Sequence, residues 1–136
     1  MRKVFYLLFA AILVMTFTFT SCDAGGNTPV GITRTVYTLY QRGNYEKAFK
    51  IMCPIGTHGL NDKDSYNEAC LKFVEATKRD LGERDGIKSF EILGEETQNG
   101  GKRVMVEIEV FFGNGDIKTR KSFFIKENGK WIEGWD

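Results

Sequence analysis

The chain is poor in the residues from which many catalytic and metal sites are built. Its 136 residues include one histidine and three cysteines. No acid or metal ligand lies close in sequence to His58, and the cysteine spacing matches no zinc motif. We therefore expect a solvated loop histidine, predict no metal or other cofactor, and find no paired acid–base or nucleophile motif that would assign a catalytic residue.

The chain also lacks an excess of charge of either sign. Nineteen lysine and arginine residues stand against 18 aspartate and glutamate residues, which gives a net charge of +1. Non-specific binding of nucleic acid depends on cations that neutralise phosphates. The composition therefore argues against a nucleic-acid partner, and the length suits one domain with a modest core.

Long apolar runs are also absent, except at the N-terminus. Arg2 and Lys3 precede an uncharged apolar stretch from Val4 to Phe19, and small residues follow it. A basic start, a short apolar stretch and small residues are typical of a secretory signal peptide. A membrane-spanning helix needs about 20 apolar residues, and this run is shorter. We predict a signal peptide over residues 1–21, with an uncleaved anchor as the alternative.

The end of this segment, Phe19-Thr20-Ser21-Cys22, resembles the lipobox of bacterial lipoproteins. The resemblance implies cleavage before Cys22, a diacylglyceryl group on its thiol, and attachment to a membrane of the bacterial cell envelope. Attachment would be stable, because each buried CH₂ contributes about 0.8 kcal/mol and more than one acyl chain is present. Residues 22–28 would hold the lipid and a tether of about 20 Å, at roughly 3.4 Å per residue. Ordinary signal cleavage that leaves Cys22 in the mature chain is the alternative.

The region from Arg103 to Lys126 gives the strongest signal of secondary structure. Two runs of alternating apolar and polar residues flank Asn114-Gly115, which predicts a β-hairpin with a two-residue turn. Turn length sets the register, so the pairing follows from the turn. The predicted pairs are Val110–Thr119, Ile108–Lys121, Val106–Phe123 and Val104–Ile125 on an apolar face, and Phe111–Lys118, Glu109–Arg120, Glu107–Ser122 and Met105–Phe124 on the other face.

Two further hairpins extend this sheet. A strand within Gly86–Thr97 should reach the central hairpin through the loop 98–100, with a left-handed Gly100 and with Phe90 and Ile92 buried. That loop would place Ile92 opposite Val106 and Phe90 opposite Ile108. An Asn-Gly turn within Glu127–Lys130 should pair Ile132 with Ile125 on the buried face. The sequence thus predicts a four-stranded antiparallel meander.

Three amphipathic helices are predicted before the sheet. Their expected bounds are Thr28-Pro29 to Gly43, Asn44 to Cys53-Pro54, and Asp62 or Asp64 to Gly82. Each helix must bury its apolar stripe, and the sheet face is the only large apolar surface available. We therefore predict an α+β domain over residues 29–136, with three N-terminal helices packed on one face of the sheet.

Four segments resemble those of a known family. They are Arg42-Gly43-Asn44-Tyr45-Glu46-Lys47-Ala48, Gly86-Ile87-Lys88-Ser89-Phe90-Glu91-Ile92, Phe112-Gly113-Asn114-Gly115 and Ile125-Lys126-Glu127-Asn128-Gly129-Lys130-Trp131. Together they are similar to small bacterial lipoproteins with a cystatin-like domain of unknown function, placed with the nuclear transport factor 2-like folds. The resemblance implies a curved sheet that wraps a long helix into a cone, sometimes with a pocket at the open end. It carries over no catalytic residues.

The cone suggests a candidate pocket. Tyr37, Tyr40 and Tyr66 lie on helical apolar stripes and could line it, or they could simply fill the core. Lys121 is the one charge on the predicted apolar sheet face, where it could meet an anionic ligand. The alternative is that Lys121 extends from the sheet edge into solvent.

Two further groups of residues each have two interpretations. Cys53 and Cys70 either form a disulfide, which would contribute roughly 3 kcal/mol, or remain two buried thiols. A predicted aromatic patch on the outer sheet face could form a homodimer or bind a protein, because exposed aromatic patches often mark interfaces. Alternatively, the C-terminal strand or lysine and arginine stems cover this patch. Its residues are Met105, Phe111, Phe124, Trp131 and Trp135.

These observations lead to three hypotheses. The first is a lipid-anchored envelope domain that binds an unidentified small molecule or protein and catalyses nothing. The second is a small isomerase-like or lyase-like enzyme, which requires an aspartate, glutamate or histidine inside the cone. The third is an interaction module that uses the aromatic outer face. No motif distinguishes them, because one architecture can host both enzymes and binding proteins.

Overall fold

The computed structural model describes residues 27–134, and its element order confirms the predicted fold. The elements are α2 (Pro29–Gln41), α3 (Tyr45–Met52), α4 (Lys63–Glu83), β1 (Ile87–Gln98), the 3₁₀ turn η1 (Asn99–Gly101), β2 (Arg103–Phe112), β3 (Ile117–Glu127) and β4 (Lys130–Gly134). The sheet is an antiparallel meander in the order β1-β2-β3-β4. The predicted signal peptide, Cys22 and Trp135 lie outside the described residues.

Side-chain caps define where the three helices begin. A cap oxygen accepts a hydrogen bond from a free amide of the first turn, which typically contributes about 1 kcal/mol. The amide of Gly31 donates to Thr28 Oγ1 (3.0 Å), that of Lys47 to Asn44 Oδ1 (3.4 Å), and that of Ser65 to Asp62 Oδ2 (3.1 Å). Asp62, rather than Asp64, therefore caps the third helix.

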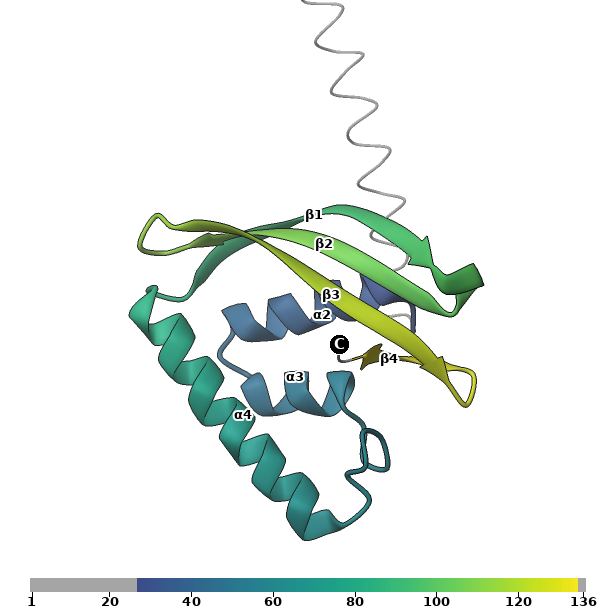
Figure 1. The fold of residues 1–136 in the computed structure, drawn as a ribbon. Coiled ribbons are helices and arrows are strands. Elements are labelled where there is room, and N and C mark those ends of the chain that lie inside the picture. Colours follow the sequence, from purple (N-terminus) through teal and green to yellow (C-terminus); the bar gives the residue numbers. More distant parts are fainter. Residues whose placement is uncertain (1–26, 135–136) are drawn as a thin grey trace, which may run out of the picture.

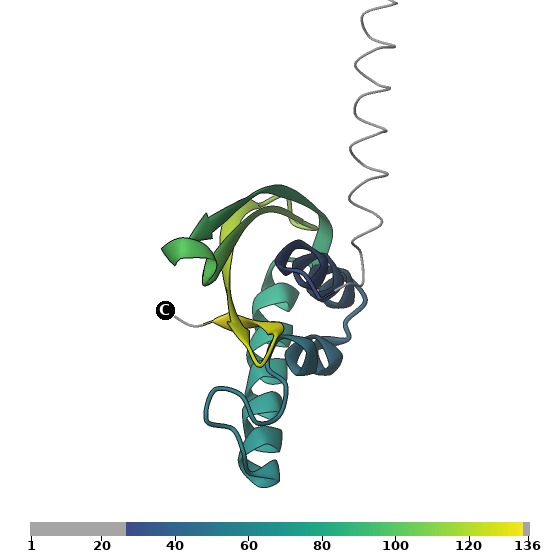
Figure 2. The same ribbon diagram turned by 90° about the vertical axis from the view of Figure 1, so that its right-hand side faces the viewer.

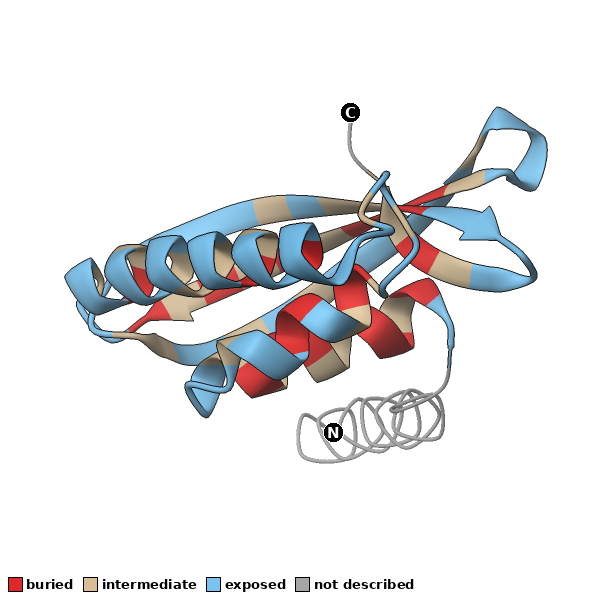
Figure 3. Cartoon of the chain, turned by 90° about the horizontal axis from the view of Figure 1, so that it is seen from below, coloured by how far each residue is buried: buried red, intermediate tan, exposed pale blue. Residues whose placement is uncertain are grey.

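The sheet curves around α2, and α4 runs obliquely beside α3 with its C-terminal end nearest the sheet (Figures 1 and 2). Helix α2 packs against β1 and β2, whereas α4 packs chiefly against α3. Figure 3 shows that α4 is exposed along most of its length, and its buried residues are limited to Tyr66, Cys70 and Leu81. Helix α4 meets the strands through few contacts, such as Leu81 in the main core and the Asp80–Arg120 ion pair, so space remains between α4 and the sheet.

The central hairpin has a longer turn than predicted. The amide of Phe112 donates to the carbonyl of Asp116 at 2.9 Å, so three residues, Gly113, Asn114 and Gly115, form the loop. The left-handed residue is Gly115, with φ of +93°. This geometry matches a type I turn followed by a glycine bulge, whereas a two-residue type I′ turn would require positive φ at Asn114 also. Asn114 Oδ1 instead accepts from the amide of Asp116 at 2.9 Å.

The extra loop residue shifts the predicted register of β2 and β3 by one position. Because side chains alternate between faces, a shift of one residue moves every side chain of β3 to the other face. The predicted pairs in this hairpin are therefore wrong. The observed pairs include Val104–Phe124, Val106–Ser122, Ile108–Arg120, Val110–Lys118, Glu107–Lys121, Glu109–Thr119, Phe111–Ile117 and Met105–Phe123.

This shift also corrects the predicted aromatic patch. Phe124 is only 1% exposed and belongs to the main core, whereas Ile125 is 38% exposed. Met105 is buried at 8% exposure, and Trp131 packs against the main core. Phe111 is half-buried. The described part of the patch is therefore not a continuous exposed aromatic surface.

The first hairpin was also predicted in the wrong register, but its faces are as expected. Ile92 pairs with Ile108 instead of Val106, and Phe90 pairs with Val110. A displacement of two residues preserves the faces, so both side chains still pack against the core. A register irregularity between Ile92 and Gly94 compensates for the longer loop over η1. The predicted left-handed Gly100 is confirmed, with φ of +63°.

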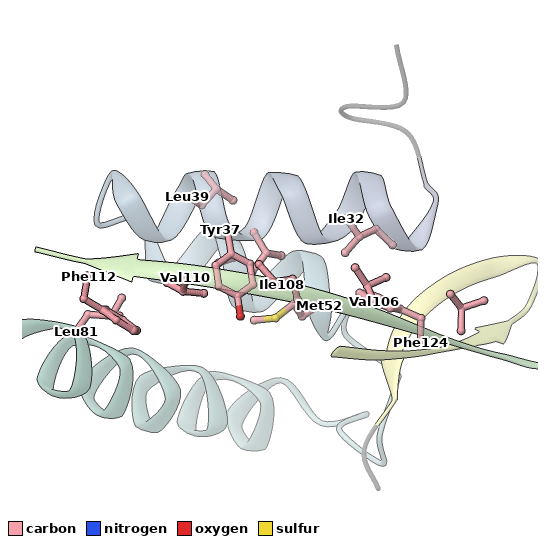
Figure 4. Close-up of a cluster of buried hydrophobic side chains, with 13 residues drawn as sticks. Ile32, Tyr37, Leu39, Met52, Leu81, Val106, Ile108, Val110, Phe112 and Phe124 are labelled. Carbon is pink, nitrogen blue, oxygen red and sulfur yellow. The ribbon is translucent and has the colours of Figure 1, made fainter. Parts of the chain in front are cut away.

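The main core lies between α2 and the concave face of the sheet (Figure 4). Its strand side comes from alternate residues of β2, which are 0 to 4% exposed. The predicted burial of Val106 and Ile108 is confirmed. The predicted pairing of Ile132 with Ile125 is also confirmed, and Ile132 is buried, although Ile125 is not. The main core comprises Ile32, Val36, Tyr37, Leu39, Ala48, Met52, Leu81, Val104, Val106, Ile108, Val110, Phe112 and Phe124.

Candidate functional site

The curved sheet and the helices enclose a hollow space, called here the cone, that contains three cavities with shared walls. The largest, of about 420 Å³, is named the glutamate cavity; one of about 350 Å³ is named the arginine cavity; the third holds about 40 Å³. Tyr40 of α2 lines all three. Phe73 of α4 lines both large cavities. The two large cavities thus lie on either side of a shared aromatic wall.

The arginine cavity opens between α4 and the strands. It is lined by Tyr37, Tyr40, Phe73, Ala76, Thr77, Asp80, Leu81, Ile87, Val110, Phe112 and Arg120. Its charges are paired: Arg120 Nη2 lies 3.5 Å from Asp80 Oδ2, and Arg84 Nε lies 3.4 Å from Asp80 Oδ1. The guanidinium groups of Arg84 and Arg120 lie 5.1 and 5.7 Å from the Phe112 ring centroid. These contacts hold the arginines at the cavity rim.

The glutamate cavity lies at the edge of β3, beyond the end of the short strand β4. It is lined by Tyr40, Phe49, Met52, Cys53, Phe73, Lys121, Phe123, Glu133 and Gly134. Four of these residues are aromatic, and Glu133 is the one carboxylate among them. Pockets for small molecules have this character, with mostly apolar and aromatic walls and few polar groups.

Glu133 is the residue in the cone with the most perturbed carboxyl group. It lies on β4 opposite Phe124, which places it on the inner face of the sheet. It is half-buried, and within residues 27–134 its carboxylate has no ion pair or side-chain hydrogen bond. Burial disfavours the charged form and raises the pKa of Glu133 to about 7. This carboxyl group therefore changes its charge near neutral pH.

Two tyrosines of α2, Tyr37 and Tyr40, line the small cavity together with Glu133. Tyr37 and Tyr40 pack edge to face, with ring centroids 5.4 Å apart, and Figure 4 shows Tyr37 extending from α2 past β2 near Met52. The Tyr40 hydroxyl donates to Met52 Sδ at 3.7 Å. Burial raises the pKa of both phenols, and the nearby Glu133 charge raises both pKa values further. Both phenols are therefore protonated at neutral pH.

The structure brings together only some of the predicted pocket residues. Tyr37 and Tyr40 line the cone, and Lys121 lines the glutamate cavity. Lys121 does not face Ile108 as predicted, because the register shift places it opposite Glu107. Tyr66 lies elsewhere, in a second buried cluster, where its hydroxyl donates to the carbonyl of Cys53 at 2.7 Å.

The second cluster also contains the two cysteines. Cys53 and Cys70 are buried beside Phe49 and Tyr66 as thiols, without a disulfide. Burial raises the pKa of Cys70. His58 is exposed in the loop between α3 and α4 and lines none of the cavities described above. Residues 27–134 contain no group of three or more histidine, cysteine or acidic side chains placed to hold a metal ion.

Local sequence patterns pointed to Lys121 but to none of the other three charged residues that line the two large cavities, which are Glu133, Arg120 and Asp80. A signal was available for Glu133, because the predicted pairing of Ile132 with Ile125 also pairs Glu133 with Phe124. A two-residue central turn places Phe124 on the outer face, whereas the observed three-residue turn places Phe124, and with it Glu133, on the inner face. Asp80 and Arg120 come together from α4 and β3, which no local pattern connects.

The chain was also compared with known proteins. No curated protein matches it. A crystal structure from Campylobacter jejuni, provisionally described as an NTF2-like transpeptidase, aligns with a TM-score of 0.57 and 15% identity over 78% of this chain and 96% of that chain. A SEC-C motif protein from Rhodopseudomonas palustris, solved in solution, aligns with a TM-score of 0.51 and 20% identity over 80% and 77% of the two chains. These identities establish the fold alone.

The family comparison covers most of the chain. Residues 21–132 match the family described as "Domain of unknown function (DUF4878)". The matched segment contains the three helices and nearly all of the sheet. The chain therefore belongs to the DUF4878 family of domains of unknown function, and its fold is NTF2-like.

Proposed function

We propose that this chain is a lipid-anchored domain of the bacterial cell envelope that binds a small molecule in its cone without chemically changing it. The observation that supports binding most directly is the pair of cavities of about 420 and 350 Å³ that share Tyr40 and Phe73. Both fall within the range of roughly 300–1,000 Å³ that is usual for ligand pockets. Their aromatic walls would remove an apolar ligand surface from water.

The location rests on the N-terminal sequence. Ser21-Cys22 follows a basic start and a short apolar run, as in lipoprotein signals. Asn27 is tied to the domain, because its Oδ1 accepts from the amide of Trp131 at 2.8 Å and its Nδ2 donates to the Trp131 carbonyl at 3.3 Å. Only four residues, 23–26, separate Cys22 from this attachment point. A lipid on Cys22 would therefore hold the cone close to the membrane. Within residues 27–134, none of the helices is long and apolar enough to cross a membrane.

The anchor has a direct test. Expression of the chain in bacteria fed an alkyne-labelled fatty acid should label the wild type and place it in the membrane fraction. The Cys22→Ser variant should lose the label, whereas its uncleaved apolar segment can still hold it in the membrane fraction. Cys53→Ser, which leaves the candidate lipid site intact, should keep both. An unlabelled wild-type chain would contradict the lipid anchor and leave the binding proposal untouched.

Binding is tested by a fragment screen observed by NMR on the full-length chain in a nonionic detergent. Ligands should perturb the signals of Tyr40 and Phe73, which line both large cavities. Phe73→Trp adds bulk to the shared wall and should weaken the hits by at least about tenfold. Leu71→Trp, on the same helix but at a residue that is 63% exposed, should not. Hits that map only outside the cone, or that Phe73→Trp leaves unchanged, would contradict the proposal.

Glu133 favours a second candidate function, an isomerase-like or lyase-like enzyme. A carboxyl group with a pKa of about 7 suits general acid–base catalysis at neutral pH. The protonated phenols of Tyr37 and Tyr40 could donate hydrogen bonds to a developing oxyanion in the same cavity group. A screen for proton abstraction next to a carbonyl would test this reading. Turnover that Glu133→Gln lowers by about 100-fold or more would support it, because general bases contribute roughly 10²–10⁴-fold.

A further inference from the structure

We infer that the glutamate cavity binds an organic ammonium group, with the aromatic rings around the cation and the Glu133 carboxylate as its counter-ion. This inference rests on the proposed function and specifies its ligand as a small molecule with a positively charged, alkylated nitrogen. Two independent features of the cavity support it: the arrangement of its aromatic rings and the unpaired carboxylate.

The aromatic rings form a continuous wall on the helical side of the cavity. The Phe73 ring centroid lies 6.4 Å from that of Tyr40 and 5.3 Å from that of Phe49. Phe123 of β3 also lines the cavity, but its ring is already occupied by the Arg103 guanidinium, 4.1 Å from the ring centroid. The faces of aromatic rings carry partial negative charge and attract cations, and cages of such rings are a common way to bind quaternary ammonium groups. Tyr40 of α2, Phe49 of α3 and Phe73 of α4 would therefore form the aromatic wall against the cation.

The Glu133 carboxylate supplies a full negative charge, which an aromatic wall alone lacks. Burying a charge without a partner is costly, and within residues 27–134 the Glu133 carboxylate has no ion pair. A cation in the cavity would compensate that charge. An aromatic cavity with a neutral ligand would gain nothing from an acid at this position, whereas an ammonium ligand would.

The positive side chains near the cone fit this assignment. Lys121 also lines the cavity, but it is exposed and lies opposite Glu107 in the β2–β3 register, so a carboxylate faces it across the strands. Arg120 lies on the arginine cavity and is paired with Asp80 at 3.5 Å. An anionic ligand would have to enter beside Glu133, whose charge would repel it.

The inference predicts a pH dependence. The groups that face Glu133 are Tyr37 and Tyr40 from α2, Cys53 at the end of α3, and Lys121 from β3. The pKa of each phenol is raised, so both stay neutral between pH 6 and 8, while Glu133, with a pKa of about 7, ionises in this range. The ionised fraction rises about tenfold from pH 6 to pH 8. Binding of a cation should tighten by up to the same factor.

The test compares three probes of nearly equal shape on the full-length chain. They are choline, its uncharged isostere 3,3-dimethylbutan-1-ol, and the anion 3,3-dimethylbutanoate, each titrated also into protein-free detergent to subtract partition into micelles. Calorimetry and NMR at pH 8 should show choline binding in the cavity at least about fivefold more tightly than the alcohol. The anion should bind most weakly, and choline should bind more weakly at pH 6.

Variants with matched controls test which residues cause the preference for choline. Glu133→Gln should remove the preference for choline over the alcohol and its pH dependence, while Glu75→Gln, an exposed acid on α4, should change neither. Phe49→Leu, which removes a ring of the helical wall, should lower choline affinity more than alcohol affinity. Phe111→Leu, at a half-buried β2 position that lines none of the cone cavities, should not.

Several outcomes would overturn the inference. Equal binding of choline and the alcohol, stronger binding of the anion, no choline binding at 20 mM, or a wild-type preference independent of pH would each do so. The pH dependence of the wild type keeps the test valid if a variant fails to fold. If the alcohol or the anion still binds in the cone, the ammonium assignment fails and the proposed function stands. If no fragment binds there, both fail.

Discussion

The buried Glu133 predicts that stability decreases as the pH rises through neutrality. Its pKa is about 7 in the folded chain, against an ordinary value of 4.5. Between these values the folded state holds a proton that the unfolded state has released. The folded state thus binds more protons, and the free energy of unfolding falls as pH increases from about 4.5 to about 7, then levels off.

The size of this effect follows from the shift. A difference of about 2.5 pKa units corresponds to roughly 3 kcal/mol at 1.36 kcal/mol per unit. Glu133→Gln keeps the shape of the side chain but cannot ionise. The variant should therefore match the wild type near pH 4.5 and exceed its stability by about 2–3 kcal/mol at pH 8. For a domain of this size, that is an increase of about 10 °C in the melting temperature.

The assay is urea unfolding at pH 5, 6, 7 and 8, read as the difference between variant and wild type. Taking the difference removes the titration of all other groups. Glu75→Gln, an exposed acid on α4, is the matched control and should follow the wild type at every pH. A Glu133→Gln difference that is constant with pH, or that is largest at pH 5, would refute the reasoning about burial.

Two further predictions test the fold. Phe124→Ala should cost about 3–5 kcal/mol of unfolding free energy, because it removes a buried ring from the core. Ile125→Ala, at a more exposed residue, should cost less than about 1.5 kcal/mol. If Ile125→Ala cost more than Phe124→Ala, the register expected from a two-residue turn would be the correct one. Gly113→Ala should lower the free energy of unfolding by about 1–3 kcal/mol, because the added Cβ would overlap the Asp85 carbonyl oxygen. Gly94→Ala is the control, because the position has open space around it. Equal melting temperatures of the two variants would contradict the close packing of the central turn.

Local sequence signals were sufficient for the elements and their order. Helix caps at Thr28, Asn44 and Asp62 and the alternating residues of β2 act within a few residues of one another. Such signals depend on backbone geometry and hydrophobic periodicity, which the chain carries wherever it folds. They predicted three helices, a four-stranded meander and the buried face of β2.

The site was less predictable because it depends on the length of one turn. Asn114-Gly115 is compatible with two-residue and three-residue hairpins, and the two place opposite faces of β3 against the core. The docking of Gly113, whose amide donates to the Gly86 carbonyl at 2.9 Å, accompanies the longer turn. This contact joins the turn to the loop after α4, so the register involves residues distant in sequence.

The sequence by itself determined an α+β domain with three helices, an antiparallel meander and an apolar sheet face, because amphipathic periodicity and turn residues are local properties. Only the tertiary structure decided which acid enters the cone and what surrounds it. Glu133, Tyr40 and Phe73 come from β4, α2 and α4, and they meet only because the curved sheet and the three helices pack around one cavity. The packing of helices against the sheet therefore decides that the Glu133 carboxylate lines the cavity.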